Sequence, residues 1–362
     1  MNMADESMII KYWGVRGSIP TPLTDKQEKE KQCANFMDVI KRGGTSKLFG
    51  DDADAPDLAE KIMQFLNNQP KSLAGTYGGD TTCLEIQARD SPLIMIDAGS
   101  GARALGNVVL GRLFSESNLN PLDSDPERKR DLHLFLTHYH WDHIQGFPFF
   151  GPAFIPKDKK VNINFYGKEN GKTRLSDALK GQQEYPLFPV GWKAMPCKKT
   201  YKELGRIAST DIPVGEVVVK YAELDHPDRV LGYSIEIDGK KFVCATDTEH
   251  RAVEDPFLVE LAKDADILYY DAQYTPEEYS GKEGPSKVRW GHSTYEWGVK
   301  TALAANVDTV VLGHYEPARD DFGVEKLMER TLEFKNECLW LPENKGKSLN
   351  VMMAYQGLEQ RL

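Results

Sequence analysis

The chain is poor in cysteine and has no long apolar run. Its five cysteines, among 362 residues, are odd in number and scattered, with no paired spacing of a zinc knuckle, so they predict reduced thiols rather than a disulfide framework. No stretch approaches the roughly 20 apolar residues that cross a bilayer, and the start of the chain lacks a basic segment followed by an apolar one. We therefore expect a cytoplasmic protein with no membrane partner.

Positive charge is also in deficit. The chain has 45 Lys and Arg against 55 Asp and Glu, which gives a formal net charge of −10. Long nucleic acids are bound largely by neutralising many phosphates with Lys and Arg, so a long nucleic acid is an unfavourable partner. A small anionic substrate remains compatible, because divalent cations bound at one site would supply positive charge locally.

Histidine is scarce too, yet three of the eight histidines fall within six residues. The run reads His-Tyr-His-Trp-Asp-His and follows the apolar, strand-like stretch 132–136. Side chains two apart project to the same side of an extended loop, so His138 and His140 can bind one ion while Asp142 and His143 face a second. Imidazole nitrogens with a carboxylate oxygen suit Zn²⁺ best, with Mn²⁺ or Fe²⁺ as alternatives. Packing alone gives no reason for four potential ligands at this spacing.

With this motif the chain resembles the metallo-β-lactamase superfamily, and later strand-like segments end in the ligands that the resemblance implies. His226 precedes an alternating stretch, Asp247 follows the segment 241–245, and His314 follows the apolar segment 309–313. The resemblance implies that Asp247 bridges two metal ions. The full ligand set would be His138, His140 and His226 for one ion and Asp142, His143 and His314 for the other.

The stretch Trp-Gly-His-Ser-Thr at 290–294 resembles the His-Ser-Thr motif of the ribonuclease Z and cyclic-nucleotide phosphodiesterase branch of this superfamily. There the histidine contacts phosphate and delivers a proton, a role that falls here to His292. Imidazole suits this role because its unperturbed pKa lies near 6.5. The alternative is that Ser293 or Thr294 simply caps the helix expected over 295–305.

Two carboxylates at the ends of strand-like segments are candidates for orienting imidazoles. Asp271 is the best available partner for His292, and a purely structural hydrogen bond is the alternative. Asp97, which precedes a glycine-rich turn, would fix the tautomer of a ligating imidazole or would simply form the turn. The predicted catalytic residues are Asp142, His292 and Asp271.

The spread of ligands from 138 to 314 favours one folding unit, so residues 1–362 are expected to form a single domain. The resemblance implies an α/β (α+β) fold, the four-layer αβ/βα sandwich, with two mixed sheets face to face, helices outside and the metals at the sheet edge. Residues 24–76 predict a helical insertion of two helices, which is either a packed outer layer or a lid or dimer surface. Residues 176–204 predict an aromatic, proline-rich loop near the site, which either stacks against a base or belongs to the core.

By resemblance the chain is predicted to be a metal-dependent hydrolase with two Zn²⁺ ions. The first hypothesis is a phosphodiesterase that hydrolyses a small phosphodiester, such as a 3′,5′-cyclic nucleotide of the cyclic AMP kind, by attack of a metal-bridged hydroxide on phosphorus. The alternatives are a ribonuclease Z-like endonuclease, an ester, lactone or β-lactam hydrolase, and a non-catalytic metal-binding sensor module. A second copy of the chain is a further expected partner if residues 24–76 form a dimer surface.

Overall fold

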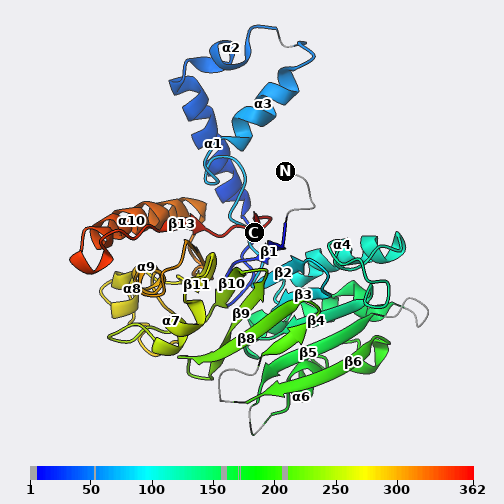
Figure 1. Ribbon diagram of the computed structural model, residues 1–362. Helices are drawn as coiled ribbons and strands as arrows, with labels where there is room; N and C mark the ends of the chain where they lie inside the picture. Colours follow the sequence, from blue (N-terminus) through cyan, green and yellow to red (C-terminus); the bar gives the residue numbers. More distant parts are fainter. Residues whose placement is uncertain (1–5, 53, 156–160, 170, 172, 206–210) are drawn as a thin grey trace.

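The computed structural model describes residues 6–52, 54–155, 161–169, 171, 173–205 and 211–362 (Figure 1). Residues 1–5, where the sequence predicts no leader, lie outside them. Within the described residues the chain forms two seven-stranded mixed sheets. The first contains, in pairing order, β14 (Glu359–Arg361), β1 (Met8–Gly14), β2 (Cys83–Ala88), β3 (Leu93–Ile96), β4 (Asp131–Phe135), β5 (Asn162–Lys168) and β6 (Lys198–Leu204). The second contains β13 (Asn350–Met353), β12 (Thr309–Gly313), β11 (Ile267–Asp271), β10 (Lys240–Ala245), β9 (Val230–Ile237), β8 (Val217–Leu224) and β7 (Ile212–Val214).

Strand β3 illustrates how the first sheet is packed on both faces. Ile94 and Ile96 belong to the core shared with the second sheet, whereas Leu93 and Met95 belong to the core that includes helix α4 (Ala102–Phe114). Successive side chains of a strand point to opposite faces, so an uninterrupted apolar run suits a sheet that is covered on both sides.

Helices cover the outer face of the second sheet as well. They are α7 (Pro256–Ala262), α9 (Tyr295–Ala304) and α10 (Asp321–Leu339), which lie on the opposite side of the molecule from α4 (Figure 1). The order of layers is therefore helix, sheet, sheet, helix, and the predicted four-layer α/β sandwich is confirmed. The remaining helices of the sandwich are short: α5 (Trp141–Ile144), α6 (Leu175–Gly181) and α8 (Pro276–Ser280). Among the described helices, none combines the length and the apolar composition needed to span a bilayer.

Parallel strands bring their carboxyl ends to a common edge. Strands β3 and β4 run parallel, as do β10, β11 and β12. The carboxyl ends of parallel strands are where α/β folds usually place their sites. The residues that follow these ends include Asp97 after β3, the histidine run after β4, Asp247 after β10, and His314 after β12, while Asp271 closes β11.

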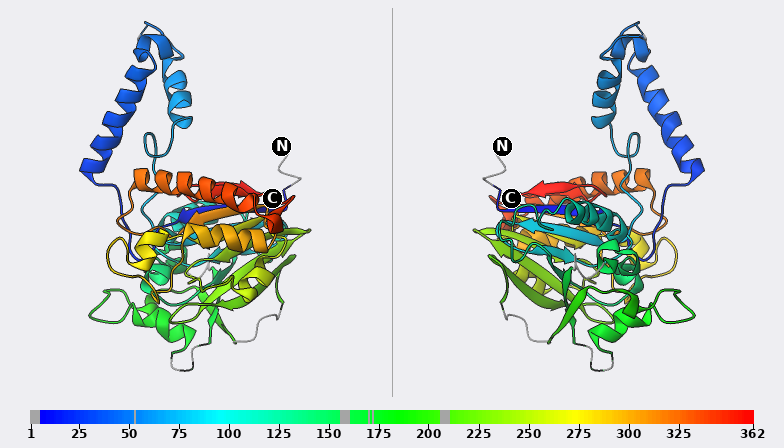
Figure 2. Two further views of the ribbon diagram at one scale, coloured as in Figure 1. Left: turned by 90° about the vertical axis from the view of Figure 1, so that its left-hand side faces the viewer. Right: turned by 90° about the vertical axis from the view of Figure 1, so that its right-hand side faces the viewer.

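The predicted helical insertion forms three helices instead of two: α1 (Asp25–Lys41), α2 (Gly44–Phe49) and α3 (Leu58–Asn67). The additional break falls at Gly43 and Gly44, both of which have positive φ, a conformation that glycine adopts at little cost. The helices stand out from the sandwich, as all views agree (Figures 1 and 2). In α1 only Lys31 is buried, and α2 and α3 have no buried residue. These helices are therefore not a packed outer layer; residues 24–76 are called the helical arm below.

The second predicted segment, 176–204, is only partly a loop. It begins inside α6 and ends with β6, the edge strand of the first sheet. The sequence of β6 is rich in lysine, which is common on edge strands because it opposes pairing with another chain, and this composition masked the strand. Between these elements Tyr185 and Leu187 are exposed, whereas Met195 and Cys197 are buried.

Candidate metal centre

Three histidines and one aspartate form the first group of potential ligands. His138 and His140 come from the loop after β4, and His226 comes from the turn between β8 and β9. One ligand atom from each, together with a carboxylate oxygen of Asp247, lies within 4.8 Å of all the others. Nε2 of His138 lies 3.6 Å from Oδ2 of Asp247. The first predicted ligand set is thus brought together.

The second group contains Asp142, His143, His314 and the other carboxylate oxygen of Asp247, again within 4.8 Å of one another. Oδ1 of Asp247 lies 3.2 Å from Nε2 of His143 and 3.0 Å from Nε2 of His314. Oδ2 of Asp142 lies 3.3 Å and 3.5 Å from the same two nitrogens. Ligands of a tetrahedral Zn²⁺ at the usual bond lengths are about 3.3 Å apart, so this spacing fits an ion of that size.

The shared aspartate and the unpartnered nitrogens both fit a pair of cations. Asp247 directs Oδ1 toward the second group and Oδ2 toward the first. Nε2 of His138, of His143 and of His314 is buried, and within the described residues none of their contacts with carboxylate oxygens has the geometry of a hydrogen bond. Buried polar atoms normally have a partner, and a metal ion would provide one for all three. The seven residues present therefore fit a centre of two divalent metal ions.

Burial and neighbouring charges together favour the metal-binding forms of Asp247, His138 and His226. Burial opposes ionisation of Asp247, but His143 and His314 outweigh it and hold the pKa of that carboxyl well below its usual range. Burial lowers the pKa of His226 to about 4, and it also holds the pKa of His138 well below 6.5. Ionised carboxylates and neutral imidazoles are the ligand forms that bind a cation. Burial would also lower the pKa values of His143 and His314, but the carboxylates around them outweigh it and raise both pKa values.

Carboxylates outside the two groups orient two of the candidate histidine ligands. Nδ1 of His143 donates a hydrogen bond to Oδ2 of Asp97 at 2.7 Å, which leaves Nε2 to face the second group. Nε2 of His140 lies 2.7 Å from Oδ2 of Asp228, so Nδ1 is the atom left for the first group. The role predicted for Asp97 agrees with this contact. The sequence analysis predicted no role for Asp228. Its position two residues after His226 could have indicated a carboxylate close to the metal ligands.

The backbone around the ligands is strained and closely packed. Three residues that come after strands have positive φ angles: Asp97 (59°), Asp247 (55°) and His314 (58°). Such conformations cost energy in residues other than glycine and cluster at functional sites. Gly17 lies against the His314 ring, since a Cβ there would come within 2.8 Å of it. The backbone N–H of Ser18 donates to Oδ2 of Asp142 at 2.8 Å, a contact with a distant segment that the sequence did not reveal.

His292 lies at the edge of the second group. Its Nδ1 is 2.8 Å from Oδ2 of Asp271 and 4.0 Å from Oδ2 of Asp247. Its ring stacks on that of His314, with centroids 5.1 Å apart. Asp271 is fully buried, and its Oδ1 accepts a backbone hydrogen bond from Gln273 at 3.0 Å. The structure thus brings His292 and Asp271 together as predicted.

The alternative role of Ser293 and Thr294, capping of the helix that follows, agrees with the position of Thr294 but not with its hydrogen bonds. Thr294 occupies the N-cap position of α9, but its side chain makes no cap hydrogen bond. The Ser293 hydroxyl lies 2.9 Å from Nδ1 of His250 and 2.9 Å from the hydroxyl of Tyr270. Neither side chain therefore caps the helix, and the Ser293 contacts hold the segment that carries His292.

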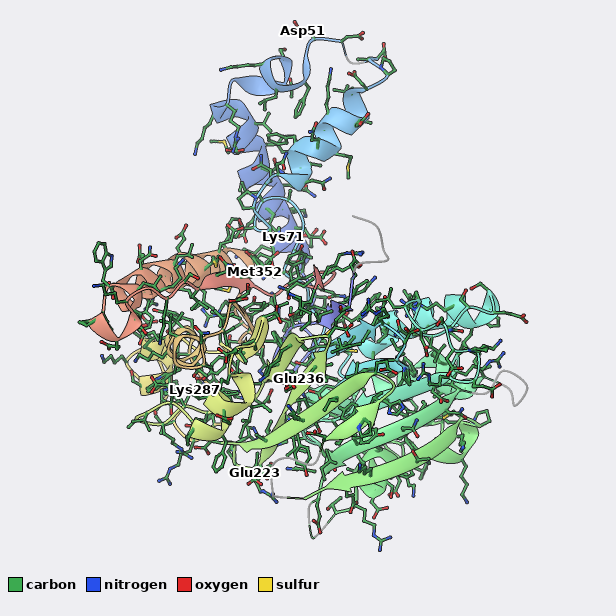
Figure 3. All side chains as sticks on the ribbon, viewed as in Figure 1. Asp51, Lys71, Glu223, Glu236, Lys287 and Met352 are labelled. Atoms are coloured by element: carbon green, nitrogen blue, oxygen red, sulfur yellow. The ribbon has the colours of Figure 1, made fainter. Side chains whose placement is uncertain are left out.

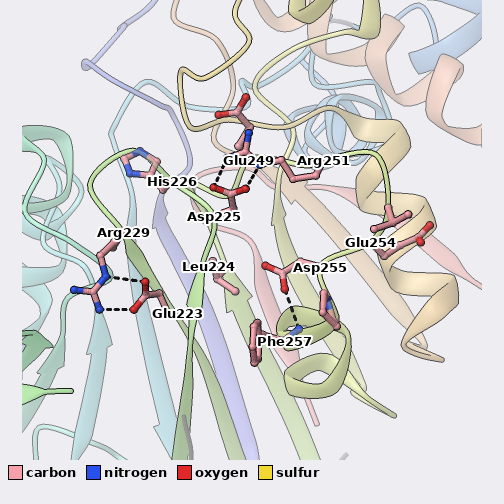
Figure 4. Close-up of a pocket in the computed structure, with 12 residues that line it drawn as sticks. Glu223, Leu224, Asp225, His226, Arg229, Glu249, Arg251, Glu254, Asp255 and Phe257 are labelled. Carbon is pink, nitrogen blue, oxygen red and sulfur yellow. Dashed lines mark hydrogen bonds and ion pairs between the residues drawn. The ribbon is translucent and has the colours of Figure 1, made fainter. Parts of the chain in front are cut away.

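A cavity of about 910 Å³ adjoins the first ligand group at His226 (Figure 4). Its wall contains two ion pairs, Glu223 with Arg229 and Asp225 with Arg251. Each arginine is neutralised by a carboxylate, so the pairs add no net positive charge. The volume lies within the range of sites that bind small molecules.

The aromatic residues within and directly after the histidine run divide between core and surface. Phe147 and Phe150 are buried, whereas Phe149 is 56% exposed and contacts Phe188 at a centroid distance of 5.5 Å. Trp141, within the metal motif, is 62% exposed. Only the exposed rings are available for stacking against a ligand.

Comparison with protein families shows that the sequence of residues 93–315 matches the family described as the beta-lactamase superfamily domain. The chain belongs to the β-lactamase superfamily. It is 22% identical over 301 residues to a ribonuclease Z of Streptococcus pyogenes, across 70% of this chain and 88% of that protein. Two solved structures share the fold: human short-form tRNase Z (TM-score 0.53, 15% identity, 97% of this chain and 98% of that one) and unliganded yeast PDE1 (TM-score 0.54, 12% identity, 99% and 100%).

These similarities confirm three predictions: the superfamily, its ribonuclease Z and phosphodiesterase-like branch, and a metal-dependent hydrolase. Membership of the β-lactamase superfamily, together with the donor set, also implies a divalent metal. Two zinc ions per chain and the roles of the individual residues stay predictions.

Proposed function

We propose that this chain is a two-metal phosphodiesterase that hydrolyses a small phosphodiester, with a 3′,5′-cyclic nucleotide such as cyclic AMP as the best candidate. The observation that carries the proposal is the pair of ligand groups sharing Asp247, with His292 at their edge. Two divalent cations lower the pKa of bound water and stabilise the attacking and leaving oxygens of an in-line displacement. The first group would use His138, His140 and His226, and the second Asp142, His143 and His314.

His292 would supply the proton that the leaving oxygen needs. Asp271 holds Nδ1 of His292, so Nε2 is the ring atom left for the substrate. The alkoxide released from a nucleotide is a poor leaving group, and protonation by a positioned acid accelerates such a step. Asp271 acts through His292 and is thus a positioning residue.

Size and charge favour a compact substrate. The protein has a net charge of −10, and the two arginines on the cavity wall, Arg229 and Arg251, are each paired with a carboxylate. A long polyanion would gain little from such a surface. A substrate with one phosphodiester and a mostly neutral organic part would bind the metals through its phosphate and place the rest in the cavity beside His226.

A ribonuclease Z-like endonuclease is the second candidate. It is favoured by the similarity to a ribonuclease Z over 88% of that protein. It is disfavoured by the deficit of basic residues, because binding of a tRNA-sized partner depends on many phosphate contacts. An acyl hydrolase has no evident need for the segment 290–294, and the filled ligand positions count against a non-catalytic module.

A turnover screen of the metal-loaded full chain tests the reaction class. The substrates are 3′,5′-cyclic AMP, a cyclic dinucleotide, bis-p-nitrophenyl phosphate and a lactone. We expect the phosphodiesters to be hydrolysed and the activity to disappear with a chelator and in Asp247→Asn. Asp211→Asn, which changes an exposed aspartate, is the matched control and keeps full activity. Hydrolysis of the lactone alone would rule out the proposal.

A further inference from the structure

The helical arm carries apolar side chains that no described part of the chain covers. On α1, Phe36 is 70% exposed, Met37 49% and Ile40 65%, and on α3 Met63 is 55% exposed. The three on α1 lie within little more than one helical turn, so they form a patch. Single exposed apolar residues are ordinary, but a patch of them marks a surface that binds another surface.

The inside of the arm is apolar but incompletely filled. Phe49 of α2 and Phe65 of α3 pack edge to face, with ring centroids 5.4 Å apart. Beside them lies a cavity of about 330 Å³. It is lined mainly by the apolar residues Phe36, Val39, Phe49, Ile62, Phe65 and Leu66. Helices this short derive most of their stability from tertiary packing, so a partner on the arm would stabilise it.

Buried contacts fix the base of the arm to the sandwich, so the far end of the arm is held away from the sandwich. Lys31 of α1 is buried; it donates hydrogen bonds to the carbonyls of Lys71 at 2.8 Å and Gly75 at 2.6 Å, and it pairs with Asp321 of α10. Figure 3 shows Lys71 near this base and Asp51 at the opposite end of the arm.

The far end of the arm carries both signs of charge side by side. The basic turn, where α1 ends and α2 follows, contains Lys41, Arg42 and Lys47. The acidic loop, directly after α2, contains Asp51, Asp52 and Asp54. Among the described residues, Lys41, Lys47, Asp51 and Asp52 form no ion pair, whereas Arg42 pairs with Asp38 at 2.7 Å. Four charges at the end of the arm are thus unpaired.

We infer that the helical arm joins two copies of this chain about a twofold axis. In a twofold contact the same surface of both chains is used, so this surface must be complementary to itself. The arm meets this condition twice: apolar Phe36 and Ile40 face their counterparts, and the basic turn of each copy faces the acidic loop of the other. A partner of one charge sign, such as a nucleic acid, would be repelled by one of the two charged segments. The few apolar side chains fall short of a standard interface of about 800 Å² per partner, so the charged tip takes part in the contact.

The oligomeric state of the full chain tests this inference. Sedimentation velocity over a range of concentrations should show a species of twice the 40.8 kDa chain mass. Met37→Ser combined with Ile40→Ser should weaken the dimer at least tenfold, with unchanged circular dichroism because both side chains are exposed and neither lines the cavity inside the arm. Trp340→Ser removes a side chain that is 88% exposed outside the arm and should leave the dimer intact. A wild-type protein that is monomeric at all concentrations would overturn the inference.

A charge exchange tests the twofold arrangement itself. The variant Lys41→Glu with Lys47→Glu, and the variant Asp51→Lys with Asp52→Lys, should each dissociate, because like charges then meet. A mixture of the two variants should dimerise again, because each reversed segment meets its opposite. Dimers in either variant alone, or no dimer in the mixture, would contradict the pairing of basic turn with acidic loop.

Cysteine cross-linking provides a test on the unmodified chain. Cys33 on α1 is the exposed one of the five cysteines and lies one turn before Phe36. A short bismaleimide should link two wild-type chains, and Cys33→Ser should abolish the product. A product that survives Cys33→Ser, or no product at concentrations where the dimer forms, would place the contact elsewhere on the molecule.

Discussion

Nδ1 of His292 donates a hydrogen bond to Oδ2 of Asp271 at 2.8 Å. Asp271 is fully buried at the end of β11, and the backbone N–H groups of Gln273 and Ser293 donate to its Oδ1. These backbone contacts hold the carboxylate in place independently of its contact with the imidazole. The ring of His292 is consequently held in one orientation, with Nε2 directed away from Asp271.

We predict that His292→Ala keeps its metals but hydrolyses diesters with alkoxide leaving groups about 10²–10⁴-fold more slowly, the usual range for a lost general acid. A p-nitrophenyl diester should lose far less, because p-nitrophenolate departs without protonation. Steady-state kinetics on both substrates measure the difference, and Asp271→Asn should show the same selectivity with a smaller loss. Equal losses on the two substrates would assign His292 to phosphate binding or support.

Asp247 and Asp97 should differ in their effect on metal content. Asp247→Asn alters an oxygen ligand that faces both groups, so both ions should be lost together. Asp97→Asn disturbs only the hydrogen bond to His143 and should weaken binding at the second position about 10- to 100-fold. Elemental analysis after dialysis against graded chelator measures both variants. Retention of one full equivalent by Asp247→Asn would show that this carboxylate does not bridge.

Gly291 should be intolerant of even a methyl group. Its φ is +90°, and a Cβ would lie 2.2 Å from Cδ2 of His226. Gly291→Ala should therefore displace the His226 ring and lower both metal affinity and turnover. Gly111→Ala is the matched control, because nothing lies within 4 Å of that position in α4 and alanine stabilises a helix by about 1 kcal/mol relative to glycine. Wild-type metal content in Gly291→Ala would show that the ring adjusts freely.

Acid should destabilise the fold partly through His133, which lies in β4 before the histidine run. Burial lowers the pKa of His133 to about 4 from its ordinary 6.5. Between these two values the unfolded chain binds a proton that the folded chain does not, so the free energy of unfolding falls as pH falls from about 6.5 to about 4. We predict that His133→Gln flattens this dependence in denaturant unfolding measured at pH 7 and pH 5. An unchanged slope would contradict the assignment.

The clustering of the potential metal ligands could be predicted because each one lies in a loop or a short helix beside a strand whose apolar sequence is recognisable. Asp247 and His314 follow β10 and β12, which both pair in parallel with β11. His138 follows β4 of the other sheet. The hydrogen bonds that Asp97 and Asp271 accept from imidazoles were predictable because both carboxylates also stand at strand ends. Local sequence and strand order thus determine most of the centre.

Contacts between distant loops could not be predicted in this way. The Ser18 N–H reaches Asp142 across 124 positions, and His250 reaches Ser293 from another loop. The position of the arm also depends on a buried contact, between Lys31 and Asp321, which are 290 residues apart. No local pattern encodes such pairings, because each residue alone is equally compatible with a solvent-exposed position.

The most direct measurement compares kcat/KM of the metal-loaded chain for 3′,5′-cyclic AMP and for a tRNA precursor with a 3′ trailer, at low and at physiological ionic strength. We expect the cyclic nucleotide or another compact diester to be cleaved with little dependence on salt, and the precursor to be cleaved poorly even at low salt, where electrostatic attraction is strongest. Efficient trimming of the precursor, with affinity that falls steeply as salt is raised, would contradict the small-substrate assignment and favour the endonuclease.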